Sequence, residues 1–434
     1  MKVRIGKSTS RPSKLGIVAS LLLLVLGVAG TAGASAPFIG DPFIIAAGPS
    51  DQTHPAVAYN SQRQQFLVAW EIGSGWFQYA QFTKDGNLAW DPPVISIAQG
   101  ERPAVAYNNA VDQYLLVWQL DSGSGYDIKA MRLQGDGLHL PGGSIIDVSV
   151  RPWHQRNPAV AVSSHPNFLD YLVVWEDVDP TWVPQHWQIW AQRVADTSGS
   201  GSGGGELIGA NFSVATKEQN SEPDVAYNLN MNEYLVVYSR EPAGGGGKGV
   251  YGQRVTGGGV SLAERAIDDT ANDQHSPTVA AYHLNHNTPY LVAYTDHRTD
   301  SAGDVRARLV DKQGQWQDLV DIASMPGRPE QEPDIAGNEA LGGYTVVWSQ
   351  TDNDWDIYTR RVRDDGTAEP AFNLSLFGLA AVPCHEQAPA VAGGSPVNFV
   401  VWQDNCLGGS GSWSIAGRLL GYRVYLPVTL RAFR

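Results

Sequence analysis

The sequence predicts an all-β fold, a seven-bladed β-propeller with four antiparallel strands per blade and the last blade closed by the N-terminal strand. Three observations support this fold class. One short motif recurs seven times, each copy is followed by runs typical of β-strands, and one strand of the seventh copy is displaced to the front of the chain. A closed ring of repeats accounts for all three observations.

The first strand of each repeat carries the motif P-x-V-A or P-x-I-A, as in PAVAYN. The copies recur at similar intervals along the whole chain. They begin at Pro55, Pro103, Pro158, Pro223, Pro277, Pro333 and Pro389. Self-similarity at such intervals is typical of repeat architectures.

The second and third strands of each repeat differ in hydrophobicity. The second is a β-branched and aromatic run such as YLVVW, which indicates a strand buried on both faces. These runs end at Trp70, Trp118, Trp175, Tyr238, Tyr294, Trp348 and Trp402. The third run, such as DIYTRRV from Asp356, is less apolar, so we expect it to be more exposed.

A fourth strand precedes the next proline in six repeats. These runs begin at Val94, Ile145, Phe212, Arg265, Leu319 and Phe372. The seventh repeat has none after Leu420, but FIIAA from Phe43 lies shortly before Pro55, much as Phe212 lies before Pro223. We therefore expect the Phe43 strand to complete the last blade and remove an exposed sheet edge. An open β-solenoid or two β-sandwiches are the alternatives, and neither explains the displaced strand.

The blade consensus P-x-V-A-Y-N, Y-L-V-V-W and D-I-Y-x-x-R-V resembles the repeat propellers of secreted and surface-exposed bacterial proteins. The resemblance covers residues 43–420. It implies the fold and export from the cell. It implies no particular activity, because that group shares none and the fold hosts many functions.

The N-terminal segment, residues 1–34, reads as a secretory signal peptide. Five basic residues precede an apolar run over residues 15–28, and Ala32-Gly33-Ala34 forms a small-residue cleavage site. An uncleaved membrane anchor is the alternative, but the run is shorter than the ~20 residues of a bilayer span. We expect a secreted or surface protein with the propeller in residues 35–420. A C-terminal tail, residues 421–434, either serves attachment or packs on the outside of the ring.

Composition restricts the partners. Residues 35–434 carry 25 Lys and Arg against 44 Asp and Glu, a net charge of −19. Such a body repels nucleic acid and anionic membranes. We therefore expect no nucleic-acid partner, no membrane span in the mature chain, and a monomer whose partner is a glycan or a surface protein.

The two cysteines, Cys384 and Cys406, both fall in the last repeat. If Val391 pairs with Phe399 in a hairpin, the two cysteines lie opposite each other, at a separation that a disulfide can bridge. We predict that they form a disulfide, which in the entropic account stabilises the fold by roughly 3 kcal/mol. A metal site is the less favoured alternative, because exported thiols are usually oxidised.

Ligands are expected on the face that carries the loops from strand two to three and from strand four to the next strand one. On blade three, Trp153, His154, Trp182 and His186 depart from the repeat, and with Trp187 they could form an aromatic cluster. Aromatic faces beside polar groups suit sugars. Blade packing is the alternative for Trp187, because an aromatic residue recurs before strand three. The others in that series are Trp76, Tyr126, Trp355 and Trp413.

Asp296, His297 and Arg298 form a second candidate ligand-binding group, on blade five. The segment is suggestive of sialidase-like propellers, but the S-x-D-x-G-x-T-W boxes are absent, and an ion pair within the loop is the alternative. Acidic loop residues could supply a glycosidase pair, and the run from Asp352 to Asp356 could bind Ca²⁺, but neither has a distinctive pattern. No nucleophile elbow is present. We predict no catalytic residue, no metal and no cofactor.

These observations predict an exported, non-catalytic binding or interaction module. The most specific form of this prediction is carbohydrate binding through the rim loops. A carbohydrate-active hydrolase or lyase is the alternative. It would require titratable side chains with perturbed pKa values that converge in a pocket. A structural partner within an envelope assembly would instead present a flat apolar patch.

Overall fold

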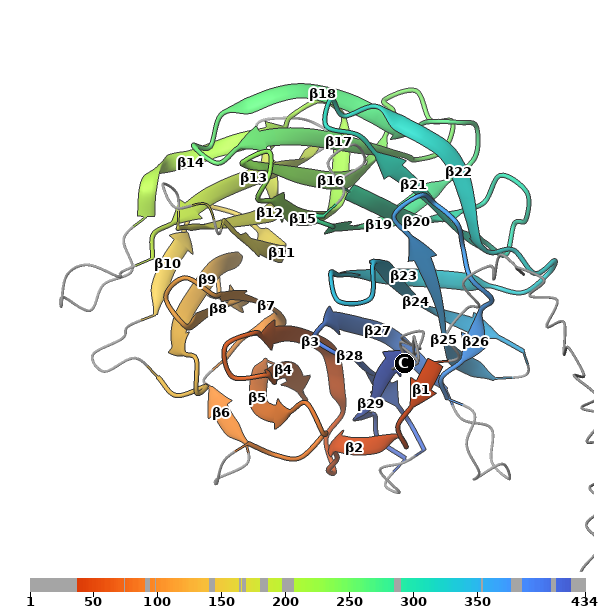
Figure 1. Cartoon of the computed structure of the whole chain (residues 1–434). Helices are drawn as coiled ribbons and strands as arrows, with labels where there is room; N and C mark the ends of the chain where they lie inside the picture. Colours follow the sequence, from red (N-terminus) through yellow and green to blue (C-terminus); the bar gives the residue numbers. More distant parts are fainter. Residues whose placement is uncertain are drawn as a thin grey trace, which may run out of the picture. The chain divides into compact units, whose positions relative to one another are not determined.

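The computed structural model describes residues 37–73, 75–89, 94–97, 99–139, 145–163, 165, 169–179, 186–196, 207–284, 290–352, 354–375, 385–406 and 411–422. All of them belong to one compact unit, residues 36–434. They form seven antiparallel sheets arranged in a ring (Figure 1). The fold is therefore the predicted seven-bladed β-propeller. The predicted signal peptide and most of the predicted tail lie outside the described residues.

The innermost strand of each blade contains the proline motif. These strands are β3 (Gln52–Asn60), β7 (Glu101–Asn108), β11 (Gln155–Val162), β15 (Gln219–Asn228), β19 (Gln274–Ala281), β23 (Glu330–Asn338) and β27 (Glu386–Gly393). We number the blades one to seven in this order. The second strands are β4 (Gln65–Ile72), β8 (Gln113–Asp121), β12 (Tyr171–Asp179), β16 (Glu233–Glu241), β20 (Tyr290–Asp296), β24 (Gly343–Thr351) and β28 (Val397–Asp404).

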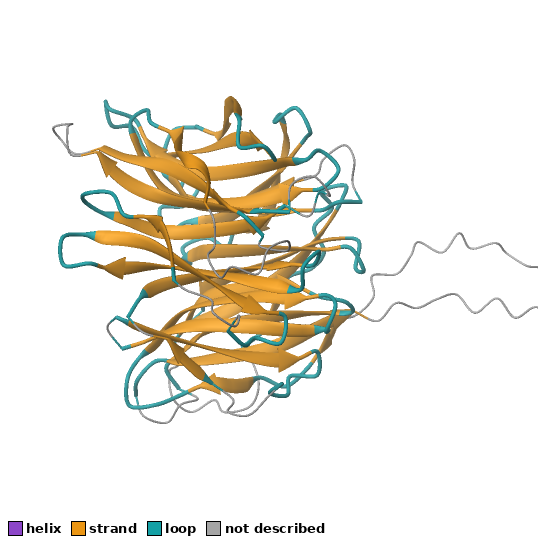
Figure 2. Ribbon diagram, turned by 90° about the vertical axis from the view of Figure 1, so that its left-hand side faces the viewer, coloured by secondary structure: helices purple, strands orange, loops and turns teal. Residues whose placement is uncertain are grey.

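The third and fourth strands form the outer half of each blade. The third strands are β5 (Trp76–Thr83), β9 (Tyr126–Gln134), β13 (His186–Val194), β17 (Gly249–Thr256), β21 (Asp304–Val310), β25 (Trp355–Arg363) and β29 (Ser414–Tyr422). The fourth strands are β6 (Ile95–Ile97), β10 (Ile146–Ser149), β14 (Leu207–Ala215), β18 (Ser261–Asp268), β22 (Trp316–Ala323) and β26 (Phe372–Asn373). Seen from the side, the strands run between the two faces of the ring, and the loops that connect them lie at these faces (Figure 2).

The N-terminal residues close the last blade. β2 (Phe43–Ala46) pairs antiparallel with β29, and Phe43 lies opposite Gly417. The Phe43 ring stacks on Phe399 of the same blade at 5.7 Å. This closure is the predicted one. A further strand, β1 (Pro37–Ile39), also pairs with β29 and was not predicted.

The core is a circle of seven hydrophobic clusters, one between each pair of neighbouring blades. Each second strand lies between two of these clusters, which explains why it is apolar on both faces. The aromatic residues at the ends of these strands, such as Trp70 and Trp175, are fully buried. The last cluster joins blades seven and one through Phe66 and Phe399.

Every innermost strand contains a β-bulge at its proline. The residue before each proline has a φ of 49° to 57°. The pairing with the second strand shifts by one residue there in all seven blades. A bulge accommodates proline, which has no N–H to donate to a ladder. The sequence analysis did not predict these bulges.

The register of the hairpin that leads to the cysteines differs from the predicted one because of the bulge. Val391 pairs with Val400, not with Phe399. Beyond the bulge the register shifts, and Glu386 lies opposite Asp404. The Asn405 N–H then donates to the His385 carbonyl at 3.2 Å, so the corrected register continues toward the two cysteines. Cys384 lies outside the described residues, and the disulfide remains a prediction.

Candidate functional site: the mouth of the central channel

A cavity of about 770 Å³ lies at the centre of the ring. The innermost strands of all seven blades line it with the residues around their prolines. These residues belong to the first half of each innermost strand, so the cavity lies toward the end where those strands begin and the second strands finish. This is the face on which the sequence analysis expected ligands.

The residue before each proline forms a ring at the mouth of this channel. The mouth ring consists of His54, Arg102, Asn157, Glu222, Ser276, Glu332 and Ala388. Its charges are unevenly distributed: His54 and Arg102 lie on blades one and two, whereas Glu222 and Glu332 lie on blades four and six. The mouth is therefore basic on one side and acidic on the other.

Two carboxylates at the mouth, Glu222 and Glu71, have lowered pKa values. Burial would raise the pKa of Glu222, but hydrogen bonds from Ser239 and the Ser276 N–H hold that pKa below its usual value. Glu71 of blade one accepts bonds from His54, 3.0 Å away, and from the Arg102 N–H. These bonds outweigh burial and lower the pKa of Glu71 in the same way.

The residue after each proline forms a second, deeper ring, the waist ring. On four blades it is alanine: Ala56, Ala104, Ala159 and Ala390. On the consecutive blades four, five and six it is Asp224, Thr278 and Asp334. One side of the cavity wall therefore carries two half-buried carboxyl groups with a hydroxyl between them, and the four alanines make the rest of the ring apolar.

Thr278 joins the two carboxyl groups of the waist ring. Its Oγ1 lies 3.0 Å from Asp224 Oδ2 and 3.2 Å from Asp334 Oδ1. A hydroxyl has one hydrogen, so it donates to one carboxylate, and it accepts a hydrogen bond from the other carboxyl group when that group is protonated. Burial, reinforced by the nearby Asp224, raises the pKa of Asp334 to about 7. Burial also raises the pKa of Asp224. Asp334 therefore keeps its proton to a much higher pH than an exposed aspartate does.

Backbone N–H groups hold both aspartates in place. Asp224 accepts the N–H groups of Val225 and Val279, each at 2.8 Å. Asp334 accepts the N–H of Val391 at 2.7 Å. Val279 and Val391 belong to the next blade in each case. The aspartates therefore also tie neighbouring blades together.

Two histidines meet beside the mouth on blade five. His275 Nε2 lies 3.0 Å from His297 Nε2, and their rings stack. His297 Nδ1 lies 3.1 Å from the carbonyl of Ser301, an acceptor, so this nitrogen carries the hydrogen. His275 then donates through Nε2 and accepts from the Ser276 hydroxyl at Nδ1. Burial lowers the pKa of His275.

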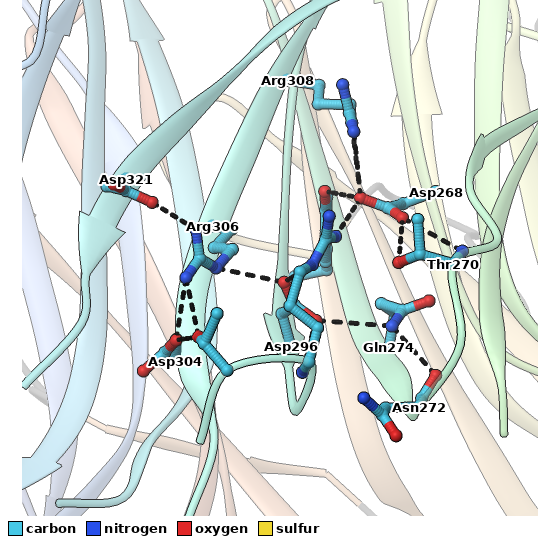
Figure 3. A network of polar contacts seen from close by, with 12 residues as sticks. Asp268, Thr270, Asn272, Gln274, Asp296, Asp304, Arg306, Arg308 and Asp321 are labelled. Carbon is cyan, nitrogen blue, oxygen red and sulfur yellow. Dashed lines mark hydrogen bonds and ion pairs between the residues drawn. The ribbon is translucent and has the colours of Figure 1, made fainter. Parts of the chain in front are cut away.

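Asp296 and Arg298, predicted with His297 as ligand-binding residues, belong to an ion-pair network between blades four and five. Arg298 Nε lies 2.5 Å from Asp296 Oδ2, and Arg298 also pairs with Asp268. The same two aspartates pair with Arg306 and Arg308 (Figure 3). Each of these three arginines already has a carboxylate partner, so none of them offers an unneutralised charge to an anionic ligand.

The described members of the predicted aromatic cluster on blade three contact different neighbours. Trp153 is about half exposed, and the His154 ring packs against Tyr126 of blade two at 5.7 Å. The Arg156 guanidinium lies 3.8 Å from the centre of the Trp187 ring. His186 begins β13 and is half-buried. Trp182 lies outside the described residues. Ligand binding by this group remains a prediction.

Sequence reasoning missed the channel itself, although the motif contained a signal. The residue after the proline is alanine in four copies but Asp, Thr and Asp in PDVAYN, PTVAAY and PDIAGN. This departure from an otherwise repeated position identifies Asp224, Thr278 and Asp334. In the described part of the chain, no group of three or more His, Cys, Asp or Glu could hold a metal ion. No helix among those residues is long and apolar enough to cross a membrane.

Comparisons with known proteins support the fold alone. A search against protein-family models matches none, and no curated protein matches the sequence. Among solved structures, the β-propeller domain of Cps50 (Swd1) from Myceliophteria thermophila aligns with a TM-score of 0.50 at 10% identity, over 87% of this chain and 99% of that domain. A Trypanosoma rangeli sialidase in complex with the inhibitor DANA gives a TM-score of 0.48 at 9% identity, over 86% of this chain and 60% of the sialidase. The class of protein shown is the β-propeller.

Proposed function

We propose that this protein is an exported, non-catalytic carbohydrate-binding module whose ligand enters the mouth of the central channel. One observation carries the proposal: a polar cavity of about 770 Å³, lined by all seven innermost strands, lies on the expected ligand face. Its size is within the ~300 to 1,000 Å³ of small-molecule sites. Export rests on the N-terminal sequence, and surface attachment on the tail.

The lining favours a ligand rich in hydroxyl groups. The mouth offers carboxylates, an amide and a hydroxyl within one ring, from Glu222, Asn157 and Ser276. Sugar hydroxyls both donate and accept, so they match such a mixture better than a purely apolar or singly charged ligand does. Exposed aromatic residues on the same side, such as Trp153, could extend the site to a longer glycan.

A carbohydrate-active hydrolase is the second candidate, and one observation favours it. Asp224 and Asp334 line the cavity, converge on one hydroxyl and have raised pKa values. Paired carboxyl groups of unequal protonation are what glycoside hydrolysis requires. However, Asp224 uses both carboxyl oxygens, and Asp334 one of its two, to accept backbone N–H groups. This favours a structural role for the pair over proton transfer to a substrate.

The test is a glycan and polysaccharide array probed with the purified protein and two variants. Ala104→Trp places a large side chain in the waist ring and should abolish binding. Trp153→Ala, on the rim of blade three, is the matched control and should retain the core interaction. Loss in Trp153→Ala with retention in Ala104→Trp would move the site to the rim. Absence of any binding would reject the carbohydrate proposal, and cleavage of a bound glycan would support the hydrolase.

A further inference from the structure

An oxygen atom bridges neighbouring blades at six of the seven junctions of the mouth ring. At each, the N–H of the residue before the proline donates to a side-chain oxygen of the preceding blade, at 2.6 to 3.1 Å. Around the ring from the junction of blades seven and one, the acceptors are Gln403, Glu71, Gln119, Glu176, Glu222 and Glu332. The oxygen therefore belongs to the repeated architecture.

The repeat supplies this oxygen in two ways. On blades one, two, three and seven it comes from a long side chain at the end of the second strand, for example Gln119. On blades four and six that position holds a short serine, and the mouth-ring glutamate of the same blade takes its place. Glu222 thus accepts Ser239 Oγ and the next blade's N–H, and Glu332 accepts Ser349 Oγ and the Ala388 N–H.

Blade five has neither arrangement. Its second strand carries Thr295 at the position of Gln119, and its mouth-ring residue is Ser276, whose hydroxyl bonds with His275. Thr295 Oγ1 is buried and has no hydrogen-bond partner within the described residues. Across the junction, the N–H of Glu332 lies in the bulge, outside the β-ladder. No side-chain oxygen of the described chain takes this N–H.

The surroundings of this open junction decide which oxygen can fill it. Glu222 and Glu332 lie at the same side of the mouth, and Asp224 and Asp334 lie deeper in the same wall. The negative charge of the two glutamates disfavours a carboxylate, sulfate or phosphate at this point. The neighbouring histidines, His275 and His297, bond with each other through their Nε2 atoms. A neutral hydroxyl oxygen fits, because it accepts the Glu332 N–H while its own hydrogen bonds with a carboxylate.

We propose that the blade five to six junction is a subsite for a hydroxyl group of a neutral sugar, which supplies the oxygen that the protein supplies at the other six junctions. This inference rests on the proposed function and narrows its ligand to uncharged glycans. A sugar hydroxyl at this position would take the hydrogen bond that the Glu332 N–H otherwise makes with solvent.

The experiment introduces a side chain of the protein itself that can supply the missing oxygen at this junction. In Thr295→Gln, the side-chain amide oxygen should bond with the Glu332 N–H, as Gln119 does with Asn157. Folding is not at risk, because two other blades carry glutamine at this position. Thr295→Val is the matched control, which changes the same residue without supplying an oxygen. Both variants and the unmodified protein are titrated with the neutral glycans that bind on the array, and their melting temperatures are measured.

We expect Thr295→Gln to weaken binding of neutral glycans by about tenfold or more, the loss of roughly one hydrogen bond, and to melt at or above the temperature of the unmodified protein. Thr295→Val should bind within about threefold of the unmodified protein. Unchanged binding in Thr295→Gln, or preference of the unmodified protein for acidic glycans, would overturn the inference but leave carbohydrate binding intact. No glycan binding at all would overturn both proposals.

Discussion

At the scale of single residues, the shared hydrogen of Thr278 is the feature with the clearest consequence. Asp224 and Asp334 both approach this hydroxyl, and only one of them can be ionised without an unfavourable contact. The remaining oxygens that the structure defines accept backbone N–H groups. The channel wall therefore retains a proton that an exposed aspartate would release near pH 4.

We predict that Asp334→Asn removes part of the pH dependence of stability. The folded protein keeps the Asp334 proton up to about pH 7, whereas the unfolded chain releases it near pH 4. The stabilising contribution is therefore full below pH 4 and is lost as the pH rises to about 7. In the variant, the amide N–H₂ donates to Thr278 and no ionisation is needed. We expect thermal unfolding at pH 8 to show a gain of about 1 kcal/mol and little difference at pH 4.

At the scale of elements, the bulge that opens each innermost strand gives the channel its mouth. Seven residues that are not glycine adopt positive φ there, at a cost of roughly 1 kcal/mol each. Each bulge directs an N–H toward the preceding blade, and at six of the seven junctions the hydrogen bond that it donates there offsets this cost. The proline next to it has no N–H to leave unpaired.

Ala388→Gly should raise the free energy of unfolding by about 0.5 to 1 kcal/mol, since glycine adopts a φ of 49° without steric cost. Ala390→Gly, two positions along the same strand at ordinary φ, is the control and should lower it by a similar amount. Urea unfolding of the two variants measures both. Equal destabilisation by the two substitutions would show that the positive φ carries no strain.

The ion-pair network between β18, β20 and β21 should act as a structural unit. Asp268 is fully buried and pairs with Arg298 and Arg308. Asp268→Ala leaves these two arginines without that carboxylate and should destabilise the protein by about 3 kcal/mol or more. The side chain of Asp321 is 61% exposed, and Asp321→Ala should cost less than about 1 kcal/mol. Chemical denaturation measures the free energy of unfolding of both variants. Similar destabilisation by the two substitutions would contradict the expectation that the buried carboxylate matters more.

At the scale of the whole molecule, the ring is closed by residues from its two ends. β1 and β2 cover the edge of β29, and Phe43 fills the cluster between blades seven and one. Without them β29 would expose unpaired N–H and carbonyl groups, which invite pairing with another chain. Closure therefore contributes to solubility as well as to stability.

A chain that begins at residue 47 should form larger oligomers or aggregates than a chain that begins at residue 35, and it should melt at a lower temperature. Both follow from the exposed edge and from the loss of Phe43 from its cluster with Phe82 and Phe399. Light scattering after size-exclusion chromatography provides the measurement. A truncated chain with the same oligomeric state and the same melting temperature as the longer chain would show that closure has no such role.

The sequence predicted the ring, its blades and its closure because these depend on repetition, which a single chain displays directly. It did not predict the bulges, since the proline motif does not reveal the sign of φ in the preceding residue. The channel site was missed for a related reason: Asp224, Thr278 and Asp334 belong to three different repeats and lie far apart along the chain. Only the ring brings them together. The blade-three aromatics are easier to recognise in the sequence, because their departure from the repeat lies within a single blade.

The most direct test of the account is the crystal structure of the protein with the neutral glycan that binds most tightly on the array. We predict a sugar ring in the mouth of the central channel, with a hydroxyl oxygen within hydrogen-bonding distance of the Glu332 N–H and another hydroxyl facing Glu222 or Asp334. A glycan seated on the outer rim, with water filling the channel, would contradict the account.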